Sequence, residues 1–214
     1  MGVSIFTDND VILKLARYDL LSSLVNIVKQ ANYEFKYLDA LPYVAGLDTP
    51  KQAAKMGLNS VSLYSIRRFI EQSSPVNLSD EGVFNFIQQQ GNAHLDAGEL
   101  ILTISASENS NSGLFTGDKR ALRAIDTLVK NKILNFSSVE VLVLEEAVRM
   151  LMHCSDRKTV VSKIRSTPGV DTALDVCFCN ESCVDEAIDS YINDAASSCR
   201  SLVFAYKKHC NVIK

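Results

Sequence analysis

The sequence predicts an α/β fold with a mostly parallel central sheet, followed by a helical C-terminal extension. Short apolar runs, which are typical of buried strands, alternate with segments whose apolar residues recur at helical spacing. Strands that are separated by helices favour parallel pairing. This alternation ends near Ser155, and the remaining chain is helix-like. We therefore divide the chain into a domain over residues 1–150 and an extension over residues 151–214 that packs on it.

Four segments are predicted to be strands of this sheet. Val3–Thr7 is a short apolar run, and Glu34–Leu38 alternates weakly between polar and apolar residues. Gly113–Thr116 and Val139–Leu144 are further short apolar runs with polar residues beside them. A helical pattern follows each strand, which is the arrangement that a parallel sheet requires.

The predicted helices have apolar residues on one side, at intervals of three and four. In chain order they are Asp10–Tyr18, Leu20–Val28, short helices within Leu41–Met56 with a break near Thr49-Pro50, Val61–Gln72, Ser79–Gln90, Lys119–Val129, Glu145–Met152 and Asp171–Cys199. The run Leu100–Ala106 is apolar almost all round, so its periodicity fits either a buried helix or a strand. Asp96 and Glu99 precede it with the spacing of a capping box, which favours a helix.

Composition limits the classes of function. The chain has 214 residues, is 47% hydrophobic and 22% charged, and carries a net charge of -3. It has no overall basic field, so any binding of nucleic acid must use local patches. Its apolar runs are too short for a membrane span, and no secretory signal is visible. We expect a cytoplasmic protein with no membrane association.

The cysteines suggest a metal site only weakly. All six lie in the C-terminal part of the chain: Cys154, Cys177, Cys179, Cys183, Cys199 and Cys210. In the absence of a secretion signal we expect reduced thiols. Cys177, Cys179 and Cys183 resemble part of a zinc site, but the usual paired C-x2-C spacing is absent. Buried or incidental thiols are the favoured interpretation.

Four acidic residues stand where ordinary surface residues are not expected. Asp8 directly follows the first predicted strand, and Asp118 comes just after the third. Asp96 and Glu99 flank the start of an apolar run. Active sites of parallel α/β sheets collect at the carboxyl ends of strands, where such acids converge. Converging carboxylates repel each other and are normally held together by a hard divalent cation. The alternative is that Asp96, Glu99 and Asp118 only cap helices.

Three segments, in this order, resemble motifs of the PIN-domain ribonucleases. Phe6–Leu13 is similar to the first motif, in which a strand ends in Asp; Asp96–Ala106 is similar to the third, and Thr116–Leu122 to the fourth. The resemblance covers roughly residues 3–145. It implies a three-layer α/β/α fold and a nuclease, acting on RNA more readily than on DNA, that depends on Mg²⁺ or Mn²⁺. It also implies an antitoxin or other regulatory protein as a partner, and dimerisation.

The resemblance assigns roles to individual residues. Asp8, Glu99 and Asp118 would be the catalytic metal ligands, Asp96 a further ligand, and Asp10 a flanking acid. The basic residues Lys119, Arg120 and Arg123, and also Arg67 and Arg68, would hold the nucleic-acid backbone; the alternative is that they are solvated helix surface. The family's second-motif Glu has no clear counterpart. Gly46 lies near the place where that Glu is expected, and the acids considered for its role are Asp39, Asp48 and Glu71.

Two other functions compete with the nuclease. Asp8-Asn9-Asp10 also resembles the D-x-D motif of haloacid-dehalogenase-type phosphatases, with Asp8 as nucleophile and Asp10 as acid–base. The last motif of that family has a second acid, but the corresponding positions here are Leu122 and Arg123, which argues against a phosphatase. A PIN-like fold without catalysis could instead serve as an RNA- or protein-interaction module.

Two further features have a functional and a structural interpretation. The acidic stretch Asp171–Asp194 is expected to be a solvated helix face, although it could cover the basic rim and restrain substrate entry. His94 could shuttle protons beside Asp96, but we expect it to be only a residue of a turn.

Overall fold

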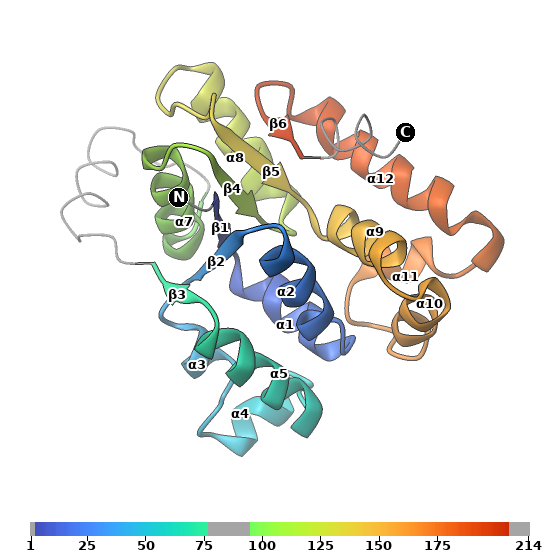
Figure 1. The fold of residues 1–214 in the computed structure, drawn as a ribbon. Coiled ribbons are helices and arrows are strands. Elements are labelled where there is room, and N and C mark those ends of the chain that lie inside the picture. Colours follow the sequence, from blue (N-terminus) through green and yellow to red (C-terminus); the bar gives the residue numbers. More distant parts are fainter. Residues whose placement is uncertain (1–2, 77–94, 206–214) are drawn as a thin grey trace.

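The computed structural model describes residues 3–76 and 95–205, and these form an α/β fold around one sheet (Figure 1). The sheet has the strand order β3-β2-β1-β4-β5-β6, and each neighbouring pair is parallel. The strands are β1 (Val3–Thr7), β2 (Tyr33–Tyr37), β3 (Ser74–Pro75), β4 (Ser112–Phe115), β5 (Val139–Leu142) and β6 (Val203–Phe204). The predicted fold class is confirmed, and the sheet is parallel throughout.

Helices lie on both sides of the sheet (Figure 1). In the first half of the chain they are α1 (Asn9–Arg17), α2 (Leu21–Gln30), α3 (Leu41–Val44), α4 (Pro50–Lys55) and α5 (Ser60–Glu71). In the second half they are α7 (Ala97–Glu108), α8 (Lys119–Lys130), α9 (Leu144–Cys154), α10 (Arg157–Arg165), α11 (Thr172–Cys177), a 3-10 turn (Glu181–Cys183) and α12 (Val184–Ser198). α7 packs against β1 and β4, whereas α2 packs against β2.

The segment whose periodicity fitted both a helix and a strand is a helix. Leu100–Ala106 lies within α7, and the reciprocal capping box of Asp96 and Glu99 starts that helix. Half of the residues of α7, including all of Leu102–Ala106, are buried because the helix packs against the central strands β1 and β4. An apolar surface all round is therefore the pattern that its position requires.

The predicted break within Leu41–Met56 is confirmed. Gly46 and the residues up to Thr49 separate α3 from α4. Gly46 has a φ of +65°, and a Cβ atom there would lie 2.6 Å from the backbone nitrogen of Ala53. Only glycine fits this turn, so Gly46 cannot be replaced by the acid that the second PIN motif would require.

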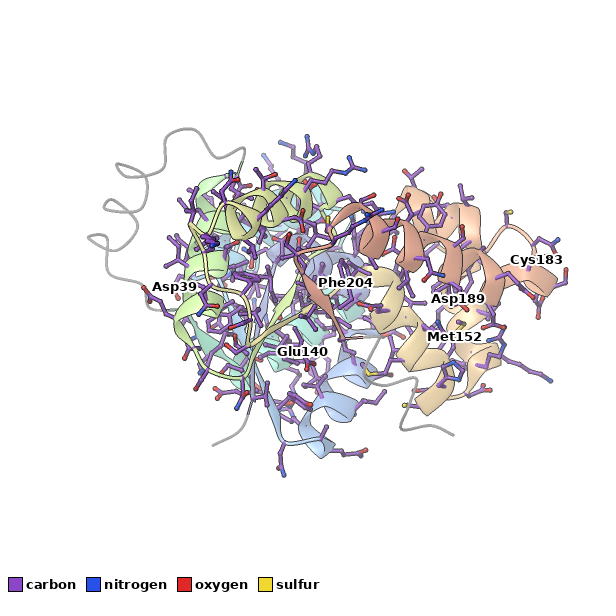
Figure 2. All side chains as sticks on the ribbon, turned by 90° about the horizontal axis from the view of Figure 1, so that it is seen from above. Asp39, Glu140, Met152, Cys183, Asp189 and Phe204 are labelled. Carbon is purple, nitrogen blue, oxygen red and sulfur yellow. The ribbon has the colours of Figure 1, made fainter. Side chains whose placement is uncertain are left out.

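The C-terminal part is helical, as predicted, but it also returns to the sheet. β6 pairs with β5, and Phe204 on β6 is completely buried (Figure 2). The predicted helix Asp171–Cys199 is divided into α11, a 3-10 turn and α12. Asn180 caps the turn by accepting a hydrogen bond from the backbone N–H of Ser182, which interrupts the helical pattern. The two-residue strands β3 and β6 were not predicted.

The C-terminal helices share the core of the rest of the chain. The buried residues of α12 belong to the same apolar cluster as those of the sheet: Val184, Ile188, Ile192 and Ala195. Arg149 on α9 forms an ion pair with Asp189 on α12, and Arg157 on α10 pairs with Asp185. Figure 2 shows Asp189 and Cys183 on the part of the molecule away from Asp39.

Some predicted features lie outside the described residues, namely the helix Ser79–Gln90, His94 and Cys210. Within residues 3–76 and 95–205, no helix is long and apolar enough to cross a membrane.

Candidate functional site

Asp8 lies at the carboxyl end of the central strand β1. Its backbone N–H donates to the carbonyl of Phe115 at 2.9 Å, which ties it to the end of the neighbouring strand β4. Its side chain is partly buried, and it accepts a hydrogen bond from the backbone N–H of Asp10 at 3.3 Å, so that it caps α1. The strand and the helix together hold the Asp8 carboxylate at the carboxyl edge of the sheet.

Asp118 follows the neighbouring strand β4 and caps α8. One of its carboxylate oxygens accepts from the backbone N–H groups of Arg120 at 2.6 Å and Ala121 at 3.3 Å. The other oxygen accepts from the Arg120 guanidinium at 2.9 Å. This guanidinium bond is the main reason that the pKa of Asp118 is lowered. Arg120, which we predicted to bind substrate, neutralises Asp118 here.

Asp96 and Glu99 cap α7 reciprocally. The backbone N–H of Glu99 donates to Asp96 at 2.8 Å, and the backbone N–H of Asp96 donates to Glu99 at 2.9 Å. Burial raises the pKa of Glu99, and the negative charges of Asp96 and Asp118 raise it further. Asp96 and Glu99 therefore cap α7, as their spacing predicted, and Glu99 also interacts electrostatically with Asp118.

Glu99 links the four predicted acids electrostatically at this edge. Burial raises the pKa of Asp8 to about 6, and the charges of Asp10, Glu99 and Asp96 contribute to the increase. Glu99 in turn interacts with Asp118. We call Asp8, Asp96, Glu99 and Asp118 the acidic cluster. Glu99, near the start of α7, thus interacts electrostatically with Asp8 after β1 and with Asp118 after β4.

The acidic cluster fits a hard cation in its chemistry, since all its donors are carboxylate oxygens. Among the described residues, however, no group of three or more His, Cys, Asp or Glu side chains is arranged to hold a metal ion. Like Asp8, the other three carboxylates are engaged in helix caps: Asp118 faces the α8 backbone and Arg120, while Asp96 and Glu99 face each other's backbone. The backbone cap bonds use one oxygen of each carboxylate, Oδ1 of Asp96, Oε2 of Glu99 and Oδ1 of Asp118, so each carboxylate keeps acceptor capacity for a cation.

The other basic residues predicted to bind nucleic acid differ in exposure and in their ion-pair partners. Arg123 is exposed on α8. On α5, Arg67 forms an ion pair with Asp48 at 3.5 Å, and Arg68 pairs with Glu71 at 2.9 Å. These pairs engage both Asp48 and Glu71, two of the acids considered for the missing second motif. The third, Asp39, is exposed beyond the end of β2.

A cleft of about 420 Å³ opens beside the acidic cluster. Its lining includes Lys14, Gly117, Lys119, Glu145, Asp171 and Tyr191. Gly117 and Glu145 follow β4 and β5, whereas Asp171 and Tyr191 come from the C-terminal part. The cleft therefore lies between the carboxyl edge of the sheet and the C-terminal helices. The sequence analysis considered Lys119 as a substrate contact, and Asp171 and Tyr191 as part of an acidic stretch that could cover a basic rim; it assigned no site role to Lys14, Gly117 or Glu145.

The charged groups of the cleft are paired with one another. The Lys14 ammonium is 2.6 Å from Asp10 and 2.9 Å from Asp171. Burial opposes the charge of Lys14, but hydrogen bonds to these two carboxylates raise its pKa. Lys119 lies 3.7 Å from Glu145 and 4.4 Å from the centre of the Tyr191 ring.

Glu145 is an acid that the sequence analysis missed as a site residue. Only 5% of it is exposed, and burial raises the pKa of its carboxyl. It follows β5 as Asp8 follows β1, so the same strand-end rule could have found it.

Among the described residues, no three cysteines are grouped so that they could hold a metal ion. Cys154, Cys177, Cys179, Cys183 and Cys199 are free thiols. Cys177 and Cys199 are buried, and burial raises the pKa of both.

The acidic cluster and the cleft adjoin each other through Asp10, which interacts with both Asp8 and Lys14. A Cβ atom at Gly117, next to Asp118, would lie 3.8 Å from a carboxylate oxygen of Asp10. Comparison with protein-family models, curated proteins and solved structures finds no match for this chain. Functional inference therefore depends on the chemistry of these two adjoining features.

Proposed function

We propose that this chain is a metal-dependent nuclease that hydrolyses phosphodiester bonds in RNA. The acidic cluster would bind Mg²⁺ or Mn²⁺, with Asp8, Glu99 and Asp118 as catalytic ligands and Asp96 as a further ligand. The single observation that carries the proposal is the Asp8 carboxyl, whose pKa is raised to about 6 at the carboxyl end of the central strand, among other acids.

Such an acid is unfavourable for the fold by itself. Burial disfavours the charged form of Asp8, and repulsion from Asp10, Glu99 and Asp96 adds to that cost. A bound divalent cation would reverse both effects, because it supplies a compensating charge. Strongly shifted acids at the carboxyl edge of a parallel sheet are typical of functional sites.

Each residue of the site has a defined part in this proposal. A bound cation supplies charge stabilisation for the phosphate and lowers the pKa of the attacking water. Asp8 is held in place by its backbone bond to Phe115 and by the start of α1. Asp118 would exchange the Arg120 guanidinium for the cation. Arg120 would then be released to contact a phosphate oxygen of the substrate, as a planar donor suited to phosphate.

Cleavage of a labelled single-stranded RNA with Mn²⁺ or Mg²⁺ tests the proposal. We expect Asp8→Asn and Asp118→Asn each to lower the cleavage rate on the order of 100-fold or more, since each removes a ligand charge. Asp156→Asn is the matched control. Asp156 caps α10 and, like Asp118, accepts from two backbone N–H groups, but it lies outside the acidic cluster. Equal loss in Asp156→Asn and Asp118→Asn would contradict a ligand role for Asp118.

A second candidate function is a non-catalytic RNA- or protein-interaction module. The caps favour it, because Asp96, Glu99 and Asp118 already have backbone partners. The same assay distinguishes the two functions. An interaction module would bind RNA without cleaving it at any Mn²⁺ concentration, and its binding would not depend on Asp8.

A further inference from the structure

The cleft beside the acidic cluster presents two ammonium groups, those of Lys14 and Lys119. Its volume of about 420 Å³ lies within the usual range for small-ligand sites, roughly 300–1,000 Å³. We propose that this cleft binds a phosphate group of single-stranded nucleic acid through Lys14 and Lys119, and that Asp171 occupies the phosphate position on Lys14 when nucleic acid is absent. This inference rests on the proposed function and specifies how its substrate is held.

Lys119 is held in place but is not fully engaged. Its ammonium group is 3.7 Å from the nearest Glu145 oxygen, which is beyond hydrogen-bond distance, and the ring of Tyr191 holds it at 4.4 Å. Among the described residues it has no hydrogen-bond acceptor. A cation held by an aromatic ring at the wall of an open cleft can receive a phosphate oxygen without first losing a strong partner.

Lys14 already binds an anionic oxygen on the cleft side. One oxygen of Asp171 caps α11 by accepting from the backbone N–H of Leu174 at 3.0 Å, and the other lies 2.9 Å from the Lys14 ammonium. A phosphate oxygen carries the same charge and accepts the same hydrogen bond. Asp171 is therefore in position to compete with a phosphate for Lys14, while Asp10 holds the ammonium from the other side at 2.6 Å.

Two helix N-termini border the cleft. Lys119 is the first residue of α8, and Leu144 and Glu145 begin α9. The backbone dipoles of both helices favour an anion at these ends.

The two partners of one ion pair provide the test. If Lys14 and Asp171 only clamp the C-terminal part onto the sheet, removing either charge breaks the same clamp and has the same effect. If Lys14 holds phosphate and Asp171 competes for it, the two substitutions change RNA affinity in opposite directions. Asn at position 171 removes the charge and still caps a helix, so α11 keeps its start.

The measurement is fluorescence anisotropy of a 5′-labelled single-stranded RNA of mixed sequence, in EDTA and at several salt concentrations. We expect Lys14→Gln and Lys119→Gln each to weaken binding about five-fold and to reduce the salt dependence by about one released counterion. Asp171→Asn should tighten binding about three-fold, because it removes a competing anion. A thermal melt of each variant verifies that it is folded.

The pair Lys163–Asp19 is the matched control. It joins α10 to the turn between α1 and α2 at 2.8 Å, and neither residue lines the cleft. Lys163→Gln and Asp19→Asn should therefore leave RNA affinity within about two-fold of the wild type. A parallel change in Lys14→Gln and Asp171→Asn, or no change in either, would overturn the inference.

The outcome is separable from that of the nuclease proposal because the binding assay contains no metal. If Lys14→Gln weakens RNA binding and Asp171→Asn tightens it, but no metal-dependent cleavage is found, the phosphate site is supported and the nuclease proposal is contradicted. Cleavage that requires Asp8, together with unchanged binding in the Lys14, Lys119 and Asp171 variants, would support the nuclease and overturn the phosphate site.

Discussion

At the scale of single residues, Asp8 illustrates how position sets chemistry. Its carboxyl would titrate near 3.8 in an unfolded chain, whereas burial at the end of β1 raises its pKa to about 6. The folded protein therefore binds a proton at Asp8 more tightly than the unfolded chain does. The stabilisation from protonated Asp8 is fully present below pH 3.8 and is lost as the pH rises through about 6.

This titration predicts a pH-dependent difference between the wild type and Asp8→Asn. In EDTA above pH 6, we expect Asp8→Asn to be more stable than the wild type by roughly 3 kcal/mol, because its side chain stays neutral. The difference should shrink towards pH 4. Urea unfolding of both proteins across this pH range measures it. A difference that does not vary with pH would show that the Asp8 pKa is not raised.

Arg120 predicts a second effect at the residue scale. Its guanidinium binds Asp118 at 2.9 Å and so competes with a cation for that carboxylate. We expect Arg120→Gln to tighten Mn²⁺ binding about three-fold in calorimetric titration, since it removes a competing and repelling positive charge. Arg123→Gln, in the same helix, should change the affinity less. Weaker Mn²⁺ binding in Arg120→Gln would contradict a ligand role for Asp118.

At the scale of elements, the strand β6 ties the C-terminal part to the sheet. Phe204 is completely buried, whereas its neighbour Val203 is 37% exposed. We expect Phe204→Ala to lower the free energy of unfolding by about 3–5 kcal/mol through loss of buried area and creation of a cavity. Val203→Ala should cost at most about 0.5 kcal/mol. Denaturant unfolding measures both, and equal effects would contradict the placement of β6.

The elements also show which structural features a sequence can predict. α1, α8 and the longer strands follow from their own apolar spacing. For α7, the apolar run fits either a helix or a strand, and only the capping box before it predicts a helix. β3 and β6 have two residues each, and their strand character comes from pairing with β2 and β5. A segment of that length has no periodicity of its own, so tertiary pairing alone reveals it.

At the scale of the whole molecule, the acidic cluster was predictable and the cleft was not. Asp8 and Asp118 follow apolar strands, and in a parallel sheet such positions share one edge. The cleft depends on Asp171 and Tyr191 reaching Lys14 and Lys119 from a distant part of the chain. No local pattern fixes that approach, which follows from the packing of α11 and α12 in the common core.

Thermal melting with Mn²⁺ tests the central claim, that the acidic cluster binds a divalent cation, most directly. A ligand that binds only the folded state stabilises it by about 2.7 kcal/mol at 100 times its Kd, so the wild-type Tm should rise with Mn²⁺ concentration. The rise should persist in Asp156→Asn and disappear in Asp8→Asn/Asp118→Asn. No rise in the wild type at millimolar Mn²⁺, or an equal rise in the double variant, would contradict a metal centre at this site.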